Sequence, residues 1–345
     1  MKDGWTYKKL GEICDIYQPK TLSSKMLLPD GKYAVYGANG IIGRYDKYNH
    51  ESSEVLMTCR GATCGTINVS EPFSWINGNA MVIHPQSDEL NKSYLVYVLK
   101  GIDLSNVITG AAQPQITRQS LSPTKIPIPP IAEQERIVAE LDLLQGIIEK
   151  KKEQLKAYDQ LAQSIFYTMF GDPIDNPKGW EVKKLGQVYK LKSGDGLSAK
   201  QFIEGQYPVY GGNGISGYHN SFNMDGDYII IGRVGAYCGN VRYVSGKFWL
   251  TDNAFQLIYD EKEQHPVFIK HLLTVLDLHQ YANHAAQPVI SNITLKEVKV
   301  LFPPLSLQEE FAEKVEAIER QKALVQQSIE ETQTMFDYTM DKYFG

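Results

Sequence analysis

Two kinds of hydrophobic pattern alternate along the chain, and each kind occurs twice. Short apolar runs such as KYAVYG (32–37), EVLMTC (54–59) and AMVIHP (80–85) are separated by turn residues and predict strands. The segments 93–104 and 267–278 carry apolar residues at helical spacing and predict a short helix in each strand-rich part. Together these patterns predict compact bodies of mixed strands and helices, an α+β fold.

The second kind of pattern follows the double prolines at 129–130 and 303–304. There the chain turns to Glu, Lys, Gln and Leu, without any proline, for about forty residues. Because proline does not fit inside a helix, each pair marks where a long helix begins. Ser306 and Glu309 predict a capping box at the second start. Ala132 has no side-chain oxygen to cap the first long helix, so the position at which that helix starts is expected to be less well defined.

Apolar residues recur along both long helices at steps of three and four, a narrow stripe that is typical of coiled coils. Lys151 interrupts the first stripe, and Lys322 and Thr332 interrupt the second. An ordinary surface helix on its own body is the alternative, but ~38 residues at 1.5 Å each make a rod of about 57 Å, longer than such a body is wide. The predicted helix–helix interface consists of Ile137, Leu141, Leu144, Ile148, Leu155, Phe311, Val315, Ile318, Val325 and Ile329.

The whole chain is two copies of one unit. AAQPQI (111–116) returns 174 positions later as AAQPVI (285–290), and other segments return at nearly the same offset. A period this long exceeds the roughly 20–50 residues of solenoid repeats and predicts a pair of domains. The further matches are GWTYKKLGEI (4–13) with GWEVKKLGQV (179–188), RGATCG (60–65) with RVGAYCG (233–239), which places Gly232 opposite Cys59, and IPIPPIAEQERI (126–137) with VLFPPLSLQEEF (300–311).

The predicted organisation is a first body at 1–130, a first long helix at 131–170, a second body at 171–304 and a second long helix at 305–345. Because the first helix ends where the second body begins, the second helix can bury its stripe by running back antiparallel along the first. The expected arrangement is a dumbbell in which a two-helix coiled coil separates two similar bodies related by a pseudo-twofold axis.

Charge is distributed unevenly over these parts. The net charge is −5, but residues 133–170 hold seven acidic and five basic residues, and residues 306–345 hold nine and four. The helices therefore carry −7 and the rest of the chain +2. Twofold-related bodies suit duplex DNA, whose half-sites recur about every 34–36 Å. With so little positive charge, phosphate contacts alone would bind it only modestly.

Composition narrows the remaining classes. No apolar run reaches the roughly 18 residues that span a bilayer, and the first residues lack a signal-peptide core, so we expect a cytoplasmic protein with no membrane partner. Four cysteines are too few for a disulfide framework. Cys59 and Cys64 could hold a metal, but the second copy offers only Cys238, so buried thiols and no metal are expected.

Arg, Asn, Gln and aromatic side chains on glycine-rich loops are suited to contacting base edges. The segments YGANGIIG (36–43) and YGGNGISG (210–217) are expected to form tight β-turns with left-handed glycine, since no phosphate-binding G-x-x-x-x-G-K-[ST] motif occurs. For every candidate, local bonding to the backbone is a competing interpretation. The candidate DNA contacts are Asn39, Arg44, Arg60, Gln115, Arg118, Asn213, Tyr218, Arg233, Gln287 and Asn292.

No motif predicts an active site. H-E-x-x-H, G-x-S-x-G and a glycine-rich nucleotide fingerprint do not occur, and no His–Cys pair recurs in both copies. We therefore expect no catalytic residues in this chain.

Three patterns, taken in order and in duplicate, resemble the specificity subunit of type I restriction-modification systems. They are G-W-x-x-K-K-L-G, A-A-Q-P-x-I, and I-P-P-I-A-E-Q-E-R-I with its counterpart F-P-P-L-S-L-Q-E-E-F. The resemblance covers essentially the whole chain. It implies two target-recognition domains that each read one half of a bipartite site on double-stranded DNA, and antiparallel spacer helices that fix the gap and dock partners. It transfers no individual base-contacting residue.

The resemblance also implies partner subunits that carry the chemistry. Two methyltransferase subunits would bind S-adenosylmethionine and methylate adenine, and optionally two restriction subunits would use ATP and Mg. The absence of an N-P-P-[YF] methylation motif agrees with a non-catalytic subunit. Two alternatives stay open. A stand-alone DNA methyltransferase or nuclease would bind S-adenosylmethionine by itself in the methyltransferase case, and a coiled-coil adaptor would bind no duplex even with partners present.

Overall fold

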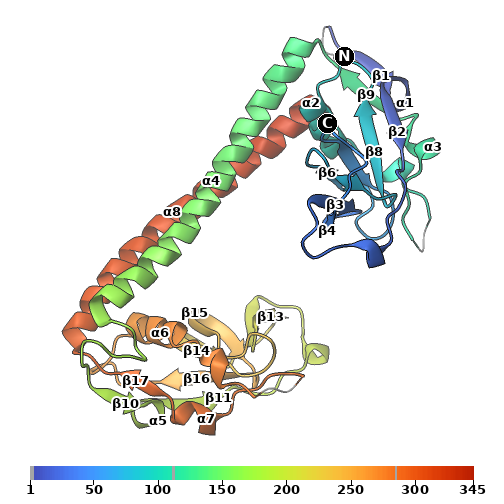
Figure 1. Cartoon of the computed structure of the whole chain (residues 1–345). Helices are drawn as coiled ribbons and strands as arrows, with labels where there is room; N and C mark the ends of the chain where they lie inside the picture. Colours follow the sequence, from blue (N-terminus) through green and yellow to red (C-terminus); the bar gives the residue numbers. More distant parts are fainter. Residues whose placement is uncertain (1–3, 111–112, 284–285) are drawn as a thin grey trace. The chain divides into compact units, whose positions relative to one another are not determined.

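A computed structural model describes residues 4–110, 113–283 and 286–345. The chain forms two compact units. The first unit contains Met1–Lys151 together with Ser328–Gly345, and the second unit contains Lys152–Gln327. Each unit therefore holds one body of mixed strands and helices and parts of both long helices (Figure 1). This agrees with the α+β fold and the internal repeat that the sequence predicts. Within the described ranges, no helix is both long and apolar enough to cross a membrane.

The body of the first unit consists of small sheets, one of which packs against α2 (Lys92–Gly101). Its short helices are α1 (Leu10–Ile13) and α3 (Arg118–Leu121). The strands are β1 (Thr6–Lys9) paired with β9 (Lys125–Ile128), then a four-stranded sheet in the order β2 (Cys14–Tyr17), β8 (Ala80–Pro85), β5 (Val55–Thr58), β6 (Ile67–Val69), and a three-stranded sheet in the order β4 (Gly40–Tyr45), β3 (Tyr33–Gly37), β7 (Trp75–Ile76).

The second unit repeats this order of elements. Its helices are α5 (Leu185–Val188), α6 (Pro266–Val275) and α7 (Asn292–Lys296). Its strands are β10 (Val182–Lys184) paired with β17 (Lys299–Leu301), and a six-stranded sheet in the order β11 (Lys190–Ser193), β16 (Ala254–Ile258), β14 (Met224–Gly232), β15 (Val241–Leu250), β12 (Tyr207–Gly211), β13 (Gly214–His219).

The bodies differ in one strand. In the second unit, β15 runs unbroken, pairing with β14 along most of its length and with β12 near its end, so that a single sheet results. In the first unit, residues 70–74 split the same stretch into β6 and β7. Pro72 has no N–H to donate to a strand ladder, and Phe73 has a φ of 53°, at which a bulky residue cannot continue a strand.

The long helices are α4 (Ile131–Phe170) and α8 (Leu305–Phe344), and both begin directly after a double proline. The predicted capping box is wrong, because Ser306 lies inside α8. The carbonyl of Pro304 instead accepts hydrogen bonds from the N–H groups of residues 307 and 308, and the carbonyl of Pro130 accepts the equivalent two bonds in α4. The two helix starts are therefore alike, and the first is no less secure than the second.

A fully buried glutamine joins each long helix to the body that precedes it. The Gln134 Oε1 accepts the N–H of Asn91 at 2.9 Å, and its Nε2 donates to the carbonyls of Glu89 and Pro129 at 2.8 and 2.9 Å. In the second unit, Gln308 forms the same three bonds with the backbone of His265, Glu263 and Pro303. Because each amide uses its oxygen and both hydrogens, it fixes how the helix leaves the body.

In the first unit, the end of α8 packs onto the body beside the start of α4. The Phe344 ring meets the Tyr94 ring edge-on, with centroids 5.7 Å apart, and Tyr343 Oη donates to Glu140 at 2.8 Å. Figure 1 shows the C-terminus beside α2. The start of α4 contributes Ile137 to the same hydrophobic core.

In the second unit, the end of α4 takes the equivalent place. The Phe170 ring packs against the rings of Phe268 and Phe311, with centroids 4.7 and 5.4 Å apart. Further along the helices, Lys322 Nζ lies 2.8 Å from Asp159 Oδ1. Residue numbers rise along α4 as those of its contacts fall along α8, so the helices run antiparallel here, as they do in the first unit.

The ten residues of the predicted interface are all at least half-buried, and their contacts across the helix pair stay a prediction. Leu155 and Val325 are half-buried, and the other eight are buried. Those nearest the helix starts, such as Ile137 and Phe311, belong to the body cores. The predicted stripe omits Phe166 and Phe170, which are fully buried.

The polar interruptions of the stripe are accommodated by contacts across the helix pair. Lys151 Nζ bonds to Ser328 and lies 3.3 Å from Thr332 Oγ1, both on α8. Lys322 forms its ion pair with Asp159 of α4 and a second one with Glu319 of its own helix. Each lysine thus finds polar partners where a leucine would have packed.

We predict that Gln308→Ala lowers the free energy of unfolding by about 2–3 kcal/mol, because it leaves a buried N–H and two carbonyls without a partner. Gln134→Ala should cost a similar amount, since it removes the same three bonds. Chemical denaturation measures both. Gln333→Ala, on the exposed side of α8, is the matched control and should change stability by less than about 0.5 kcal/mol. Equal effects at 308 and 333 would contradict this account of the helix start.

We also predict that the second unit loses stability in mild acid. His271 of α6 lies edge-on to Phe311, and burial, followed by the charges of Lys270 and Lys322, lowers its pKa to about 3. The folded state therefore disfavours the proton, so stability is full above the ordinary pKa near 6.5 and declines as pH falls below it. Unfolding at pH 5 should require roughly 1–2 kcal/mol less than at pH 7. This decline should shrink in His271→Gln; an unchanged decline would refute the assignment.

Candidate nucleic-acid interface

Three repeated loops meet in each body and are tied together by backbone hydrogen bonds. In the first unit, the loop after β5 donates from Cys59 N–H to the Asn79 carbonyl at 3.4 Å and from Gly61 N–H to the Pro114 carbonyl at 3.0 Å. Ile116 N–H donates back to the Cys59 carbonyl at 3.0 Å. Residues 113–116 of the AAQP segment are thereby fixed beside the loop after β5, whereas Ala111 and Ala112 lie outside the described residues.

The second unit builds the same scaffold. Arg233 N–H donates to the Asn253 carbonyl at 2.8 Å, Gly235 N–H to the Pro288 carbonyl at 2.9 Å, and Ile290 N–H to the Arg233 carbonyl at 2.9 Å. The repeated segments therefore encode a fixed arrangement of loop backbones. Side chains on these loops are free to differ between the two units without altering that arrangement.

This scaffold corrects the alignment of the two copies. Arg233 occupies the position of Cys59, and the bridge between Val234 and Val289 replaces the one between Arg60 and Gln115. Matching Arg60 with Arg233 in the sequences places Gly232 opposite Cys59, one residue out of register. The two loops are equally long, and their backbone bonds keep a constant offset of 174 residues. Gln287 corresponds to Gln113, as the offset of 174 between the two AAQP segments gives.

The glycine-rich segments form hairpin turns, as predicted. Gly40 and Gly214 have φ values of +113° and +105°, which favour glycine, and in both units a strand follows. The turns carry Asn39 in the first unit and Asn213 in the second, and both side chains are exposed.

Two candidates of the first unit are engaged in local bonds. The Asn39 Oδ1 accepts the hydroxyl of Thr63 at 2.7 Å and that of Thr58 at 3.2 Å. Arg44 donates to the carbonyls of residues 31 and 32 at 2.6 and 2.7 Å. Both side chains thus make the local bonds of the competing interpretation, and their contacts with DNA stay predictions.

The other three candidates of the first unit lie on or next to the loop scaffold. Arg60 is exposed and pairs through its backbone with Gln115, which is half-buried. Arg118 is exposed at the first position of α3. Their proposed contacts with DNA stay predictions.

The candidates of the second unit also include side chains with local contacts and side chains that are exposed. Arg233 is half-buried, its guanidinium lies 5.3 Å from the Phe255 ring centroid, and it donates to a carbonyl at 3.4 Å. Asn292 is half-buried and donates to the Leu191 carbonyl at 3.3 Å. Tyr218, with 54% of its surface accessible, and Gln287 are exposed.

Asn213 and Gln287 line one hollow of about 420 Å³, formed where the turn between β12 and β13 meets the loops after β14, before β16 and before α7. Asn253 is the third amide of this hollow. The structure thus brings together two of the predicted contact residues that lie 74 positions apart in sequence.

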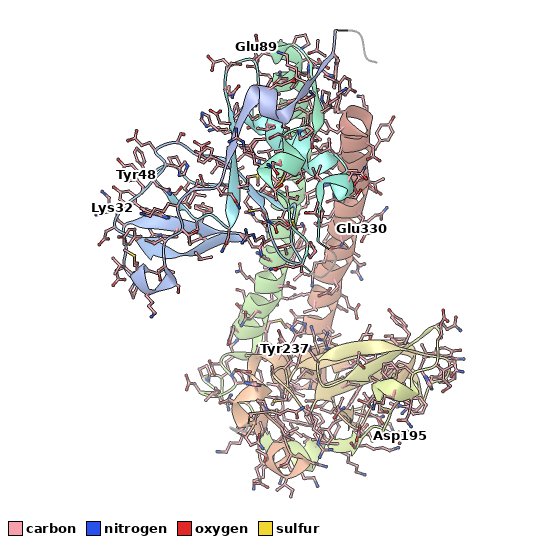
Figure 2. All side chains as sticks on the ribbon, turned by 90° about the vertical axis from the view of Figure 1, so that its right-hand side faces the viewer. Lys32, Tyr48, Glu89, Asp195, Tyr237 and Glu330 are labelled. Atoms are coloured by element: carbon pink, nitrogen blue, oxygen red, sulfur yellow. The ribbon has the colours of Figure 1, made fainter. Side chains whose placement is uncertain are left out.

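Sequence reasoning missed some exposed groups. In the first unit, Tyr48 stacks edge-on between Tyr33 and Phe73, Phe73 is 49% exposed, and Lys32 lies 5.0 Å from the Tyr33 ring centroid. Figure 2 shows Lys32 and Tyr48 close together on one edge of this unit. In the second unit, Arg242 donates to the Asn213 carbonyl at 3.3 Å. The interleaved Lys and Tyr residues of 45–48 were the available signal for the first group.

The cysteines do not form a metal site in the part of the chain that the structure describes. There, no group of three or more His, Cys, Asp or Glu side chains is arranged to hold an ion. Cys59 Sγ lies 3.1 Å from both Gln18 Nε2 and the Asn79 carbonyl. Burial raises the pKa of the Cys238 thiol, so it stays protonated near neutral pH.

Comparison with known proteins identifies relatives of this chain. The protein-family model described as "Type I restriction modification DNA specificity domain" matches twice, at residues 2–157 and 177–333. The type I restriction enzyme EcoprrI specificity subunit of Escherichia coli is 35% identical over 151 residues, which cover 41% of this chain and 37% of that protein. A putative type I specificity subunit of Mycoplasma pneumoniae is 25% identical over 69% of this chain and 68% of that one. The matches thus span from about a third to two thirds of these relatives.

Solved structures support the fold. A crystal structure of a type I restriction-modification S subunit from M. genitalium is 20% identical, with a TM-score of 0.63 over 99% of this chain and 96% of that one. A chain from a study of complex assembly and conformational transition of the type I R-M system is 17% identical, with a TM-score of 0.60 over 100% of this chain and 98% of that one. Since the family model matches well over half of its residues, the chain belongs to the type I restriction modification DNA specificity domain family.

Proposed function

We propose that this chain is the non-catalytic sequence reader of a type I restriction-modification complex. Each unit reads one half of a bipartite site on double-stranded DNA through its loop scaffold and neighbouring loops. Helices α4 and α8 set the gap between the half-sites and provide docking surfaces for methyltransferase subunits.

The observation that carries this proposal is one loop scaffold, built twice, that presents different side chains. Matching backbone bonds hold Cys59 and Arg233 in the first and second units, and the adjacent bridges join Arg60 to Gln115 and Val234 to Val289. A repeated enzyme site would keep the chemical groups and vary the support. Here the backbone scaffold is the same in both units and the side chains on it differ. This is expected of two domains that recognise two different DNA sequences.

The chemistry is assigned to partner subunits. Two methyltransferase subunits would bind S-adenosylmethionine and methylate adenine, and where restriction subunits join, they would use ATP and Mg. This chain would contribute recognition and spacing, and it would act in the cytoplasm, where the DNA is. The modest +2 charge of the parts outside the helices agrees with a reader that depends on partners for much of its grip on DNA.

We predict that exchanging residues 171–304 for the matching body of a relative changes one half of the methylated sequence and leaves the other half intact. Exchanging residues 1–130 should change the complementary half. Sequencing that detects methylated adenine in cells carrying the complex measures both. A change in both halves, or in neither, after a single exchange would contradict the assignment of one half-site to each unit.

A further inference from the structure

The hollow of the second unit combines three exposed amides with apolar walls. Asn213, Asn253 and Gln287 each reach it from a different loop, and Phe202 and Ile215 are among its apolar lining residues. Within the described ranges, none of the three amide side chains has a hydrogen-bond partner. Their donors and acceptors are available to a ligand.

The described lining residues include no charged side chain, and the neighbouring Arg242 guanidinium donates to the Asn213 carbonyl at 3.3 Å. This restricts the base pair that the hollow could read. Guanine is typically read by Arg or Lys on O6 and N7, and cytosine by a carboxylate that accepts from N4. Asn and Gln instead match adenine, because an amide can donate to N7 and accept from N6 at once, and apolar side chains suit the methyl group of thymine.

The shape of the hollow depends on glycine. A Cβ on Gly212 would overlap the carbonyl oxygen of Val234, and one on Gly232 would overlap the carbonyl oxygen of Gly212. In the first unit, Ala38 and Thr58 stand at these two positions, and the Thr58 hydroxyl donates to the Ala38 carbonyl. In the first unit, side chains therefore join the two loops, and the Asn39 side chain takes part in these bonds.

We propose that this hollow reads an A·T base pair in the half-site of the second unit. The amides of Asn213 and Gln287 contact the N7 and N6 edge of adenine in the major groove, and Ile215, which is 52% exposed, contacts the thymine methyl group. Asn253, whose backbone carbonyl is part of the scaffold, supports the hollow from its third side. The assignment rests on the proposed function and adds to it a base pair and the residues that read it.

The test uses the full chain assembled with its methyltransferase subunits and a library of duplexes randomised over the methylated sequence. In the double variant Asn213→Ala with Gln287→Ala, we expect the preference for A·T to fall about 10- to 100-fold at one position, within the half-site assigned to the second unit. All other positions should keep their preference. A base preference that survives in full, or a relaxed position that is G·C, would overturn the inference.

A modified base tests the contact itself. Replacing adenine at that position by 7-deazaadenine removes the N7 acceptor, so the unsubstituted chain should lose activity on this duplex by about 10-fold or more. The double variant should be indifferent to the change. Equal sensitivity of both proteins would overturn the proposal.

Two further variants control for folding. Asn220→Ala removes an exposed amide of the same unit that does not line the hollow, and it should leave the methylated sequence unchanged. Should the double variant unfold, Asn213→Asp and Gln287→Glu keep the side-chain shape while removing the donor to N7, and must also relax the A·T preference. If the unsubstituted complex methylates no split sequence, the proposed function fails, and this inference with it; an unchanged sequence in the variants defeats the inference alone.

Discussion

The packing of a helix end into each unit's core is the interaction on which the rest of the structure depends. Phe344, at the end of α8, packs against Tyr94 in the first unit, and Phe170, at the end of α4, packs against Phe268 and Phe311 in the second. Burying one such ring contributes about 1.5–3 kcal/mol. Because each helix begins in one copy of the repeat and ends in the core of the other unit, neither copy has a complete core of its own.

The buried glutamines and the loop scaffold connect this core packing to the proposed function. Gln134 and Gln308 fix how each helix leaves its body, and the backbone bonds among the repeated loops fix where recognition side chains stand. Both the glutamine bonds and the loop backbone bonds are the same in the two copies of the repeat. What differs between the units is the set of side chains on the loops, the Gly212 and Ala38 positions included. A constant frame with variable contacts is what modular sequence reading requires.

Sequence reasoning predicted those features that repeat or follow a period, namely the duplication, the α+β bodies and the antiparallel helices. It failed at positions where a single contact determines the local structure. The capping box was wrong because the Pro304 carbonyl already serves the first N–H groups of α8. The alignment at Arg233 was wrong because it matched the two arginines, whereas the backbone bonds place Arg233 at the position of Cys59. Asn39 and Arg44 could not be separated from Asn213, because only coordinates reveal that local hydroxyls and carbonyls engage the first two.

The antiparallel pairing within one chain can be tested by crosslinking paired cysteines. Cysteine pairs at Lys151 with Ser328 and at Asp159 with Lys322 replace residues in contact across α4 and α8. Both should crosslink within a monomer on treatment with a short bifunctional thiol reagent, which spans the length of the lysine side chain, in a chain whose half-buried Cys64 is changed to serine. A pair at Arg136 and Ser328 should not, since 15 residues of α4, about 22 Å, separate Arg136 from Lys151. Crosslinks only between chains, or none at either contact, would contradict the account.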